Sequence, residues 1–187
     1  MSDRLITPPT AEPVSVYDLK SHARVTNSAE DAILGDYIEA ARQHVEGQTG
    51  RALAVQTREF SSDAFPADGI IRLGFAPLVS VVSVKYLDRA GAEQTLAPAS
   101  YLADVRSEPG SVLLAVGATW PATAAVRNSV RVTYVCGNST APAVLRQAVL
   151  FLAAHWYEQK LPVNVGNIIN EIPHTLESLL WSNRVIG

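Results

Sequence analysis

The chain has 187 residues, of which 48% are hydrophobic, and a formal net charge of −3 at pH 7. This length suits one domain, and the apolar content supports a packed core, which excludes a disordered tail. The basic residues are scattered, which argues against direct gripping of nucleic acid, and no apolar run approaches the roughly 20 residues that span a bilayer.

The first thirteen residues contain Pro8, Pro9 and Pro13 and are predicted to form an extended arm. They hold no apolar region of a signal peptide, so we expect a product that folds and assembles in the cytoplasm. Ser15 and Asp18 then have the spacing of a capping box, which predicts a short helix. We assign residues 1–52 to an N-terminal arm and helices.

A long helix is predicted over residues 29–48. Ser28 and Asp31 repeat the start signal. Apolar residues follow at helical spacing, namely Ile33, Leu34, Tyr37, Ile38, Ala41 and Val45. Gly50 is expected to end this helix as its C-cap.

Residues 53–136 have a different texture, with short β-branched and aromatic runs broken by Pro and Gly. The runs predict strands at 53–60, 70–73, 79–87, 93–96, 101–105, 112–116 and 130–135. Turn residues at 88–91 join the third and fourth of these strands as a hairpin. The regular turns favour an inserted antiparallel β-rich unit over βαβ crossovers.

A second long helix is predicted within residues 137–161. Pro142 opens it, at the helix position where a missing N–H has no cost. Residues 148–154 are apolar almost all round, so this helix is expected to be buried on more than one side, in a core or against neighbouring subunits. Residues 162–187 are predicted to form a C-terminal docking segment, extended at 163–172 and with a last helix from Pro173.

These elements predict an α+β fold in which residues 1–187 form a single adaptor domain. Its helical core has two long helices plus short terminal helices, and the antiparallel β-rich unit is inserted into that core.

The polar residues form no recognisable reaction centre. The four histidines lack the spacing of zinc ligands. Gly47 and Gly50 fit a helix end rather than a phosphate-binding loop. The single cysteine, Cys136, is predicted to be a small buried hydrophobe. We therefore predict no catalytic, cofactor-binding or metal-binding residues, no cofactor, and a protein that is not an enzyme.

Apolar side chains are concentrated near the C-terminus. A terminal segment normally frays unless it docks, so this concentration implies a partner surface on this chain or on another. The residues are Ile168, Ile169, Ile172, Leu176, Leu179, Leu180 and Trp181.

Several segments, in order and spacing, carry a family resemblance over nearly the whole chain. They are Leu5-Ile6-Thr7-Pro8-Pro9, Glu12-Pro13-Val14-Ser15, Thr49-Gly50-Arg51-Ala52-Leu53, the strand at 79–86, Trp120-Pro121, the run from Pro142 to Ala148, and His155-Trp156-Tyr157-Glu158. Together they resemble the head–tail connector, or adaptor, family of long-tailed double-stranded DNA phages and gene transfer agents.

The resemblance implies a structural subunit in the neck of a phage or gene transfer agent particle. It implies a ring, usually of twelve subunits, that binds beneath the portal protein and receives a stopper or tail-terminator protein on its lower face. DNA would pass through the centre without specific binding. The C-terminal residues named above would then contact the portal, and the family offers no catalytic residues to assign.

Three other interpretations stay open at this point. The first is a tail-terminator or other neck ring protein, which would not bind portal alone. The second is a small-molecule-binding module or enzyme, which would show a deep pocket with His155 near a carboxylate. The third is a nucleic-acid binder, which would show salt-dependent affinity for duplex DNA.

Overall fold

The computed structural model describes residues 2–159 and 174–185 and divides the chain into two compact units. The β unit comprises residues 1–10, 55–139 and 185–187, and the helical unit comprises residues 11–54 and 140–184. Helices and antiparallel sheets together confirm the predicted α+β class. The assignment of residues 1–187 to a single adaptor domain stays a prediction.

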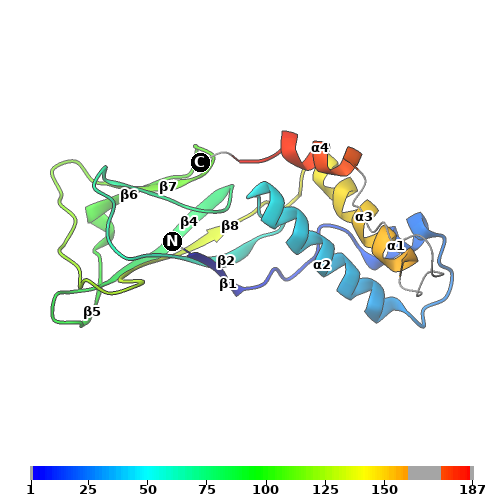
Figure 1. Cartoon of the computed structure of the whole chain (residues 1–187), viewed down its shortest axis with the longest axis horizontal. Helices are drawn as coiled ribbons and strands as arrows, with labels where there is room; N and C mark the ends of the chain where they lie inside the picture. The colour runs from blue at the N-terminus through cyan, green and yellow to red at the C-terminus, as the bar shows by residue number, and fades with distance from the viewer. Residues whose placement is uncertain (1, 160–173, 186–187) are drawn as a thin grey trace. The chain divides into compact units, whose positions relative to one another are not determined.

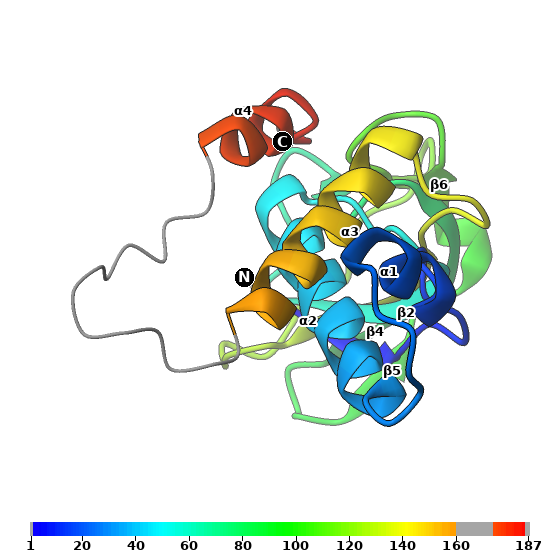
Figure 2. The ribbon, with the colours of Figure 1, turned by 90° about the vertical axis from the view of Figure 1, so that its right-hand side faces the viewer.

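The helical unit contains α1 (Val16–Ala23), α2 (Asp31–Thr49), α3 (Ala143–Glu158) and α4 (His174–Ser182). The two long helices α2 and α3 lie side by side, α1 packs against both, and α4 lies across them (Figure 1, Figure 2). The shared core buries one face of every helix. It consists of Val14, Leu19, Leu34, Ile38, Ala41, Val45, Leu53, Ala141, Leu145, Ala148, Val149, Leu152, Ala153, Ala154, Leu176 and Leu180.

The ends of α1 and α2 follow two of the three predicted local signals. The predicted capping box of α1 forms, with the Asp18 amide donating to Ser15 Oγ and the Ser15 amide donating to the Asp18 carboxylate, each at 3.1 Å. Gly50 ends α2 in the left-handed conformation at φ 66°, as predicted. The second capping box is wrong, because Asp31 pairs with Lys20 Nζ at 2.8 Å and α2 begins only at Asp31.

The β unit is built on a five-stranded antiparallel sheet with strand order β1-β2-β8-β4-β5. Its strands are β1 (Ser2–Thr7), β2 (Gln56–Ser62), β4 (Leu78–Leu87), β5 (Glu93–Thr95) and β8 (Val130–Cys136). β8 is central and alternates strictly, so that Val130, Val132, Tyr134 and Cys136 are buried while the residues between them are partly exposed. Cys136 therefore occupies the buried position expected of it.

A second, three-stranded antiparallel sheet has the order β3-β7-β6. It consists of β3 (Ile70–Arg72), β6 (Tyr101–Asp104) and β7 (Ser111–Leu114), and a 3₁₀ turn, η1 (Pro98–Ser100), precedes β6. Asp88 closes the predicted β4–β5 hairpin, since its carboxylate accepts hydrogen bonds from the amides of Ala90 and Ala92. Gly91 provides the left-handed residue of that turn, at φ 82°.

The N-terminal residues differ from the predicted extended arm. Residues 2–7 are extended, but they form the edge strand β1, which pairs antiparallel with β2 from Ser2 opposite Ser61 to Thr7 opposite Thr57. A register shift between Leu5 and Thr7 ends the regular ladder just before Pro8. An irregularity of this kind, followed by proline, limits pairing at an exposed strand edge.

Candidate assembly surfaces

The predicted portal-binding residues fall into three groups in the structure. Ile168, Ile169 and Ile172 lie outside the described residues. Leu176 and Leu180, on α4, are buried in the core of the helical unit, and Leu179 is partly buried against the same core. Trp181, on the same helix, is 71% exposed. Among the described residues of the set, Trp181 is therefore the large side chain that faces outward.

A groove between α2 and α4 runs beside Trp181. The groove has a volume of about 280 Å³ and is lined by His44, Gln48, Glu177, Leu180, Trp181 and Arg184. The Arg184 guanidinium lies 5.4 Å from the centre of the Trp181 ring, a cation–π distance. On α2, His44 also makes an edge-to-face contact with Trp156, at 6.0 Å between ring centres. Aromatic residues and arginine, both present here as Trp181 and Arg184, are enriched at protein-binding surfaces.

A second groove lies where α1, α3 and α4 meet. It has a volume of about 230 Å³ and is lined by His22, Gln147, Ala148, Phe151, Leu176 and Leu179. Phe151, on α3, is 43% exposed, whereas the three residues that follow it, 152–154, are buried. The faces of α3 that pack inside the subunit are buried, and they carry Leu145, Ala148, Val149, Leu152, Ala153 and Ala154. Phe151 leaves an apolar patch on the outside.

The charged residues of the helical unit are organised around one buried arginine. Arg42 is 1% exposed, and its Nε donates to Glu12 Oε2 at 2.7 Å while Nη1 donates to Glu46 Oε2 at 3.1 Å. The other oxygen of Glu46 accepts the backbone N–H of Leu53 at 2.7 Å. Arg42 therefore ties the residues before α1 to α2, and Glu46 ties α2 to the chain that leaves it.

Electrostatics keep Arg42 charged. Its burial opposes the charge, but hydrogen bonds and the negative charges of Glu12 and Glu46 outweigh that cost, so the pKa of Arg42 is raised. Glu39 completes the group at 3.8 Å from Nη2. With its charge matched by carboxylates, Arg42 is placed to hold the fold together rather than to bind an external anion.

The β unit contains a comparable polar cluster below β1. The Asp3 carboxylate accepts hydrogen bonds from Arg58 Nε at 2.7 Å and from Tyr134 Oη at 2.5 Å. The Arg58 guanidinium also lies over the Phe75 ring, 3.6 Å from its centre. Burial, followed by the charge of Asp3, raises the pKa of Tyr134, so its phenol stays protonated and donates to Asp3. This cluster anchors the first strand of the chain.

A third hollow, of about 460 Å³, lies in the β unit. It is lined by Phe60, Ser62, Ala64, Pro66, Ala67, Asp68, Ile70, Ile71 and Arg72. The lining is mainly apolar, and the polar pair at its edge, Arg72 and Asp68, is joined by a salt bridge of 2.8 Å.

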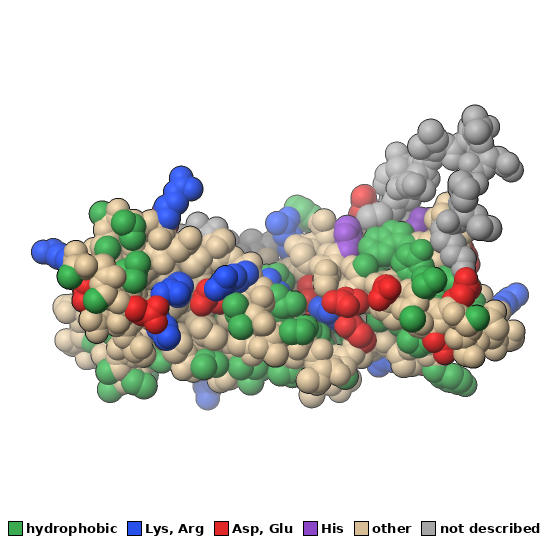
Figure 3. Space-filling view, turned by 90° about the horizontal axis from the view of Figure 1, so that it is seen from below, with side chains coloured by type: hydrophobic (Ala, Val, Ile, Leu, Met, Phe, Trp, Pro, Cys, Tyr) green, Lys and Arg blue, Asp and Glu red, His purple; other side chains and the backbone are tan. Residues whose placement is uncertain are grey.

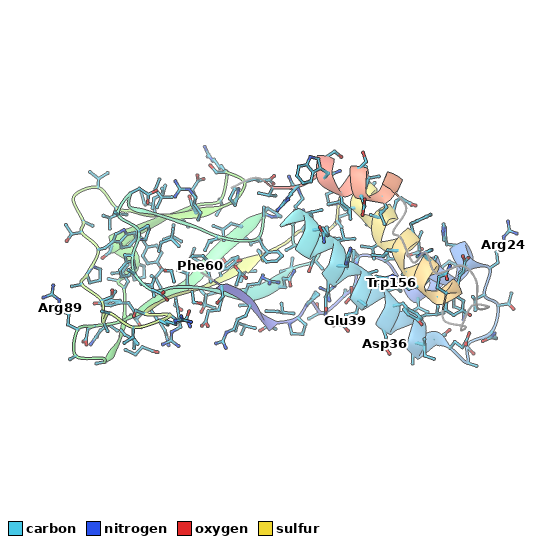
Figure 4. The ribbon with its side chains drawn as sticks, in the orientation of Figure 1. Arg24, Asp36, Glu39, Phe60, Arg89 and Trp156 are labelled. Carbon is cyan, nitrogen blue, oxygen red and sulfur yellow. The ribbon has the colours of Figure 1, made fainter. Side chains whose placement is uncertain are left out.

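Acidic side chains gather on one face of the helical unit (Figure 3). Asp36 and Glu39 point outward from α2, and in the β unit Arg89 points outward from the β4–β5 turn (Figure 4). Acidic and basic residues balance in the β unit, so the net negative charge of the chain falls on the helical unit. Such a surface repels the phosphates of DNA.

Within the described parts of the chain, no group of three or more His, Cys, Asp or Glu side chains could hold a metal ion. A search of residues 2–159 and 174–185 also finds no helix long and apolar enough to cross a membrane. His22 is exposed on α1, His44 is partly exposed on α2, and His155 is partly buried near the end of α3.

Comparison with known proteins gives a family and a set of structural relatives. Residues 13–98 match the family of phage gp6-like head-tail connector proteins. The resemblance to the head–tail connector family is confirmed. This match covers α1, α2 and strands β2 to β5. A comparison with curated proteins finds no match.

Solved structures of gene transfer agent particles contain chains that resemble this chain over its entire length. A chain from the neck of an empty gene transfer agent particle, computed with C6 symmetry, has a TM-score of 0.80 at 23% identity. A chain from the virion of a native gene transfer agent particle gives 0.78 at 26%, and one from the neck of a native particle with C12 symmetry gives 0.76 at 25%. Each comparison covers 100% of this chain and 97% of the other.

The sequence did not reveal the two polar clusters, because their members are far apart in the chain. Glu12 and Arg42 are 30 residues apart, and Asp3 and Tyr134 are 131 apart. A local signal existed for the part of the first cluster on α2, where Glu39 and Glu46 stand three and four residues from Arg42, spacings that favour ion pairs on a helix.

Proposed function

We propose that this chain is a head–tail adaptor subunit that forms a ring in the neck of a phage-like particle, between the portal and the tail. The observation that carries the proposal is the likeness in fold to neck chains, which covers 100% of this chain and 97% of each neck chain. The match to the head-tail connector family supports the same conclusion from sequence. In this role the two units act together as one adaptor domain.

The ring would contain about twelve subunits, in keeping with the C12 symmetry of one matched neck, and each subunit would offer different faces to its two neighbours. DNA would pass through the centre without specific binding. The net charge of −3 and the acidic face of the helical unit support this, because like charges prevent DNA from adhering.

A structural rather than an enzymatic role agrees with the placement of the buried charges. Arg42 is matched by carboxylates inside the helical unit, and Asp3 is matched by Arg58 and Tyr134 inside the β unit. These charged groups are paired inside the folded units, which suits a structural role for them.

The portal contact is proposed on the C-terminal residues 168–181. Within the described part of this segment, Leu176 and Leu180 hold α4 on the helical core, while Trp181 and the adjoining groove face outward. Large aromatic residues at exposed positions commonly provide most of the energy of a protein interface. Trp181 is therefore the residue on which we place the contact.

The test is to mix the purified chain with portal protein, with no tail protein present, and to image the complexes. An adaptor forms a ring on the portal, and Trp181→Ala weakens binding without unfolding the chain. Tyr17→Ala is the matched control, because Tyr17 is also a large aromatic residue of the helical unit and is 80% exposed. A chain that binds tail protein but not portal would instead be a tail-terminator or other neck ring protein.

A further inference from the structure

Strand β1 is attached to the β unit in an unusual way. It is the first element of the chain, yet it pairs with β2, which follows the whole of α1 and α2. It contacts the sheet along one edge only, since it stands at the end of the order β1-β2-β8-β4-β5. An edge strand at a chain terminus is the element most easily exchanged for the same element of another copy.

The side chains of β1 find all their described partners on the sheet below. Asp3 is held by Arg58 and Tyr134, at 2.7 and 2.5 Å. Arg4 pairs with Glu59, and Ser2 Oγ hydrogen-bonds Ser61 Oγ at 2.8 Å. Gly74 permits this seating, because a Cβ there would lie 3.0 Å from Asp3 Oδ2. A β1 strand from another copy would meet the same set of partners.

The connection that leaves β1 is short and stiff. Residues 8–11, Pro8-Pro9-Thr10-Ala11, separate the end of β1 from Glu12, which is fixed by its 2.7 Å ion pair with Arg42. Two adjacent prolines restrict φ and so limit the conformations open to this connection. Short, constrained hinges between two anchored segments favour exchange of the terminal segment between copies.

We propose that β1 is exchanged between adjacent subunits of the ring, so that the β1 strand of one copy pairs with β2 of the next. The inference rests on the proposed function, which places many copies side by side. The contacts of β1 are the same in both arrangements, and exchange adds a link between subunits without requiring a new surface. A hinge of four residues spans at most about 14 Å, which restricts exchange to direct neighbours.

A disulfide between β1 and β2 distinguishes the two arrangements. Ser2 and Ser61 are directly opposite, so Ser2→Cys with Ser61→Cys places two thiols within bonding reach. Rings of this variant are assembled first under reducing conditions, confirmed by their size, then oxidised and separated on a denaturing gel. Variants with one of the two changes are the controls, and the native Cys136 is buried.

Exchange predicts a ladder of covalently linked subunits that extends toward the full ring. Rings of normal size that yield only cross-linked monomers would overturn the exchange and leave the proposed function intact. Failure of the wild-type chain to form rings would instead count against the proposed function.

A mixing experiment decides the case even where no disulfide forms. Asp3 and Arg58 form an ion pair in the wild-type chain. Asp3→Arg puts a second positive charge beside Arg58, and Arg58→Asp puts a second negative charge beside Asp3. In a mixed ring with exchanged strands, each altered residue meets an opposite charge on the neighbour. Exchange predicts that the mixture forms rings at lower concentration than either variant alone. Equal behaviour of the mixture and the separate variants would refute it.

Discussion

Removing the side chain charge of Arg42 should destabilise the subunit more than any change at a surface ion pair. Arg42→Met keeps most of the aliphatic volume but removes the guanidinium that pairs with the Glu46 carboxylate, whose side chain is 4% exposed. Loss of one partner of a buried ion pair costs about 3–5 kcal/mol. A typical domain has a free energy of unfolding of about 5–15 kcal/mol, so the variant should lose a large fraction of its stability.

Urea unfolding followed by circular dichroism measures this loss. Glu39→Gln is the control, because Glu39 is 51% exposed and 3.8 Å from the guanidinium, and it should change the free energy of unfolding by about 0–1 kcal/mol. The double variant Arg42→Met with Glu46→Gln should recover part of the loss, since it removes both buried charges. Equal, small effects of Arg42→Met and Glu39→Gln would refute the reasoning.

Three further changes test other parts of the account. Ile38 is 1% exposed, so Ile38→Asp should lower the free energy of unfolding by several kcal/mol and abolish folding. Ile33 is 46% exposed, so Ile33→Asp should leave a near-normal thermal melt. Leu180→Ala should lower the free energy of unfolding by about 2–5 kcal/mol because Leu180 fills the helical core, and an unchanged melt would show that α4 does not dock there. Hydrogen bonds from Gln94 and from backbone amides hold the pKa of Asp88 below its usual 3.8. A carboxyl of depressed pKa stabilises the fold above pH 3.8, and this contribution disappears as pH falls through the folded value. Asp88→Asn should therefore reduce the loss of stability on acidification, measured by urea unfolding at a series of pH values.

Local patterns predicted most of the fold. The alternation of buried residues in β8 and the apolar stripe that includes Leu34, Ile38 and Val45 in α2 depend on neighbours in sequence, so periodicity alone reveals them. The predicted capping box at the start of α2 is wrong. The Asp31 side chain forms an ion pair with Lys20, eleven residues earlier, and does not cap the helix.

The candidate surfaces were harder to predict, because they depend on which side of an element meets the core. The apolar residues of α4 pointed to a docking segment, but composition does not separate Leu176 and Leu180, which are buried, from Trp181, which is exposed. Similarly, the first residues were recognised as extended, while the pairing of Asp3 with Tyr134 required contacts across 131 residues.

Imaging of particles assembled with and without this chain tests the central claim most directly. An adaptor between portal and tail predicts filled heads that lack tails when the chain is absent, and a ring of its density below the portal when it is restored. Particles that join heads to tails normally without it would contradict the account.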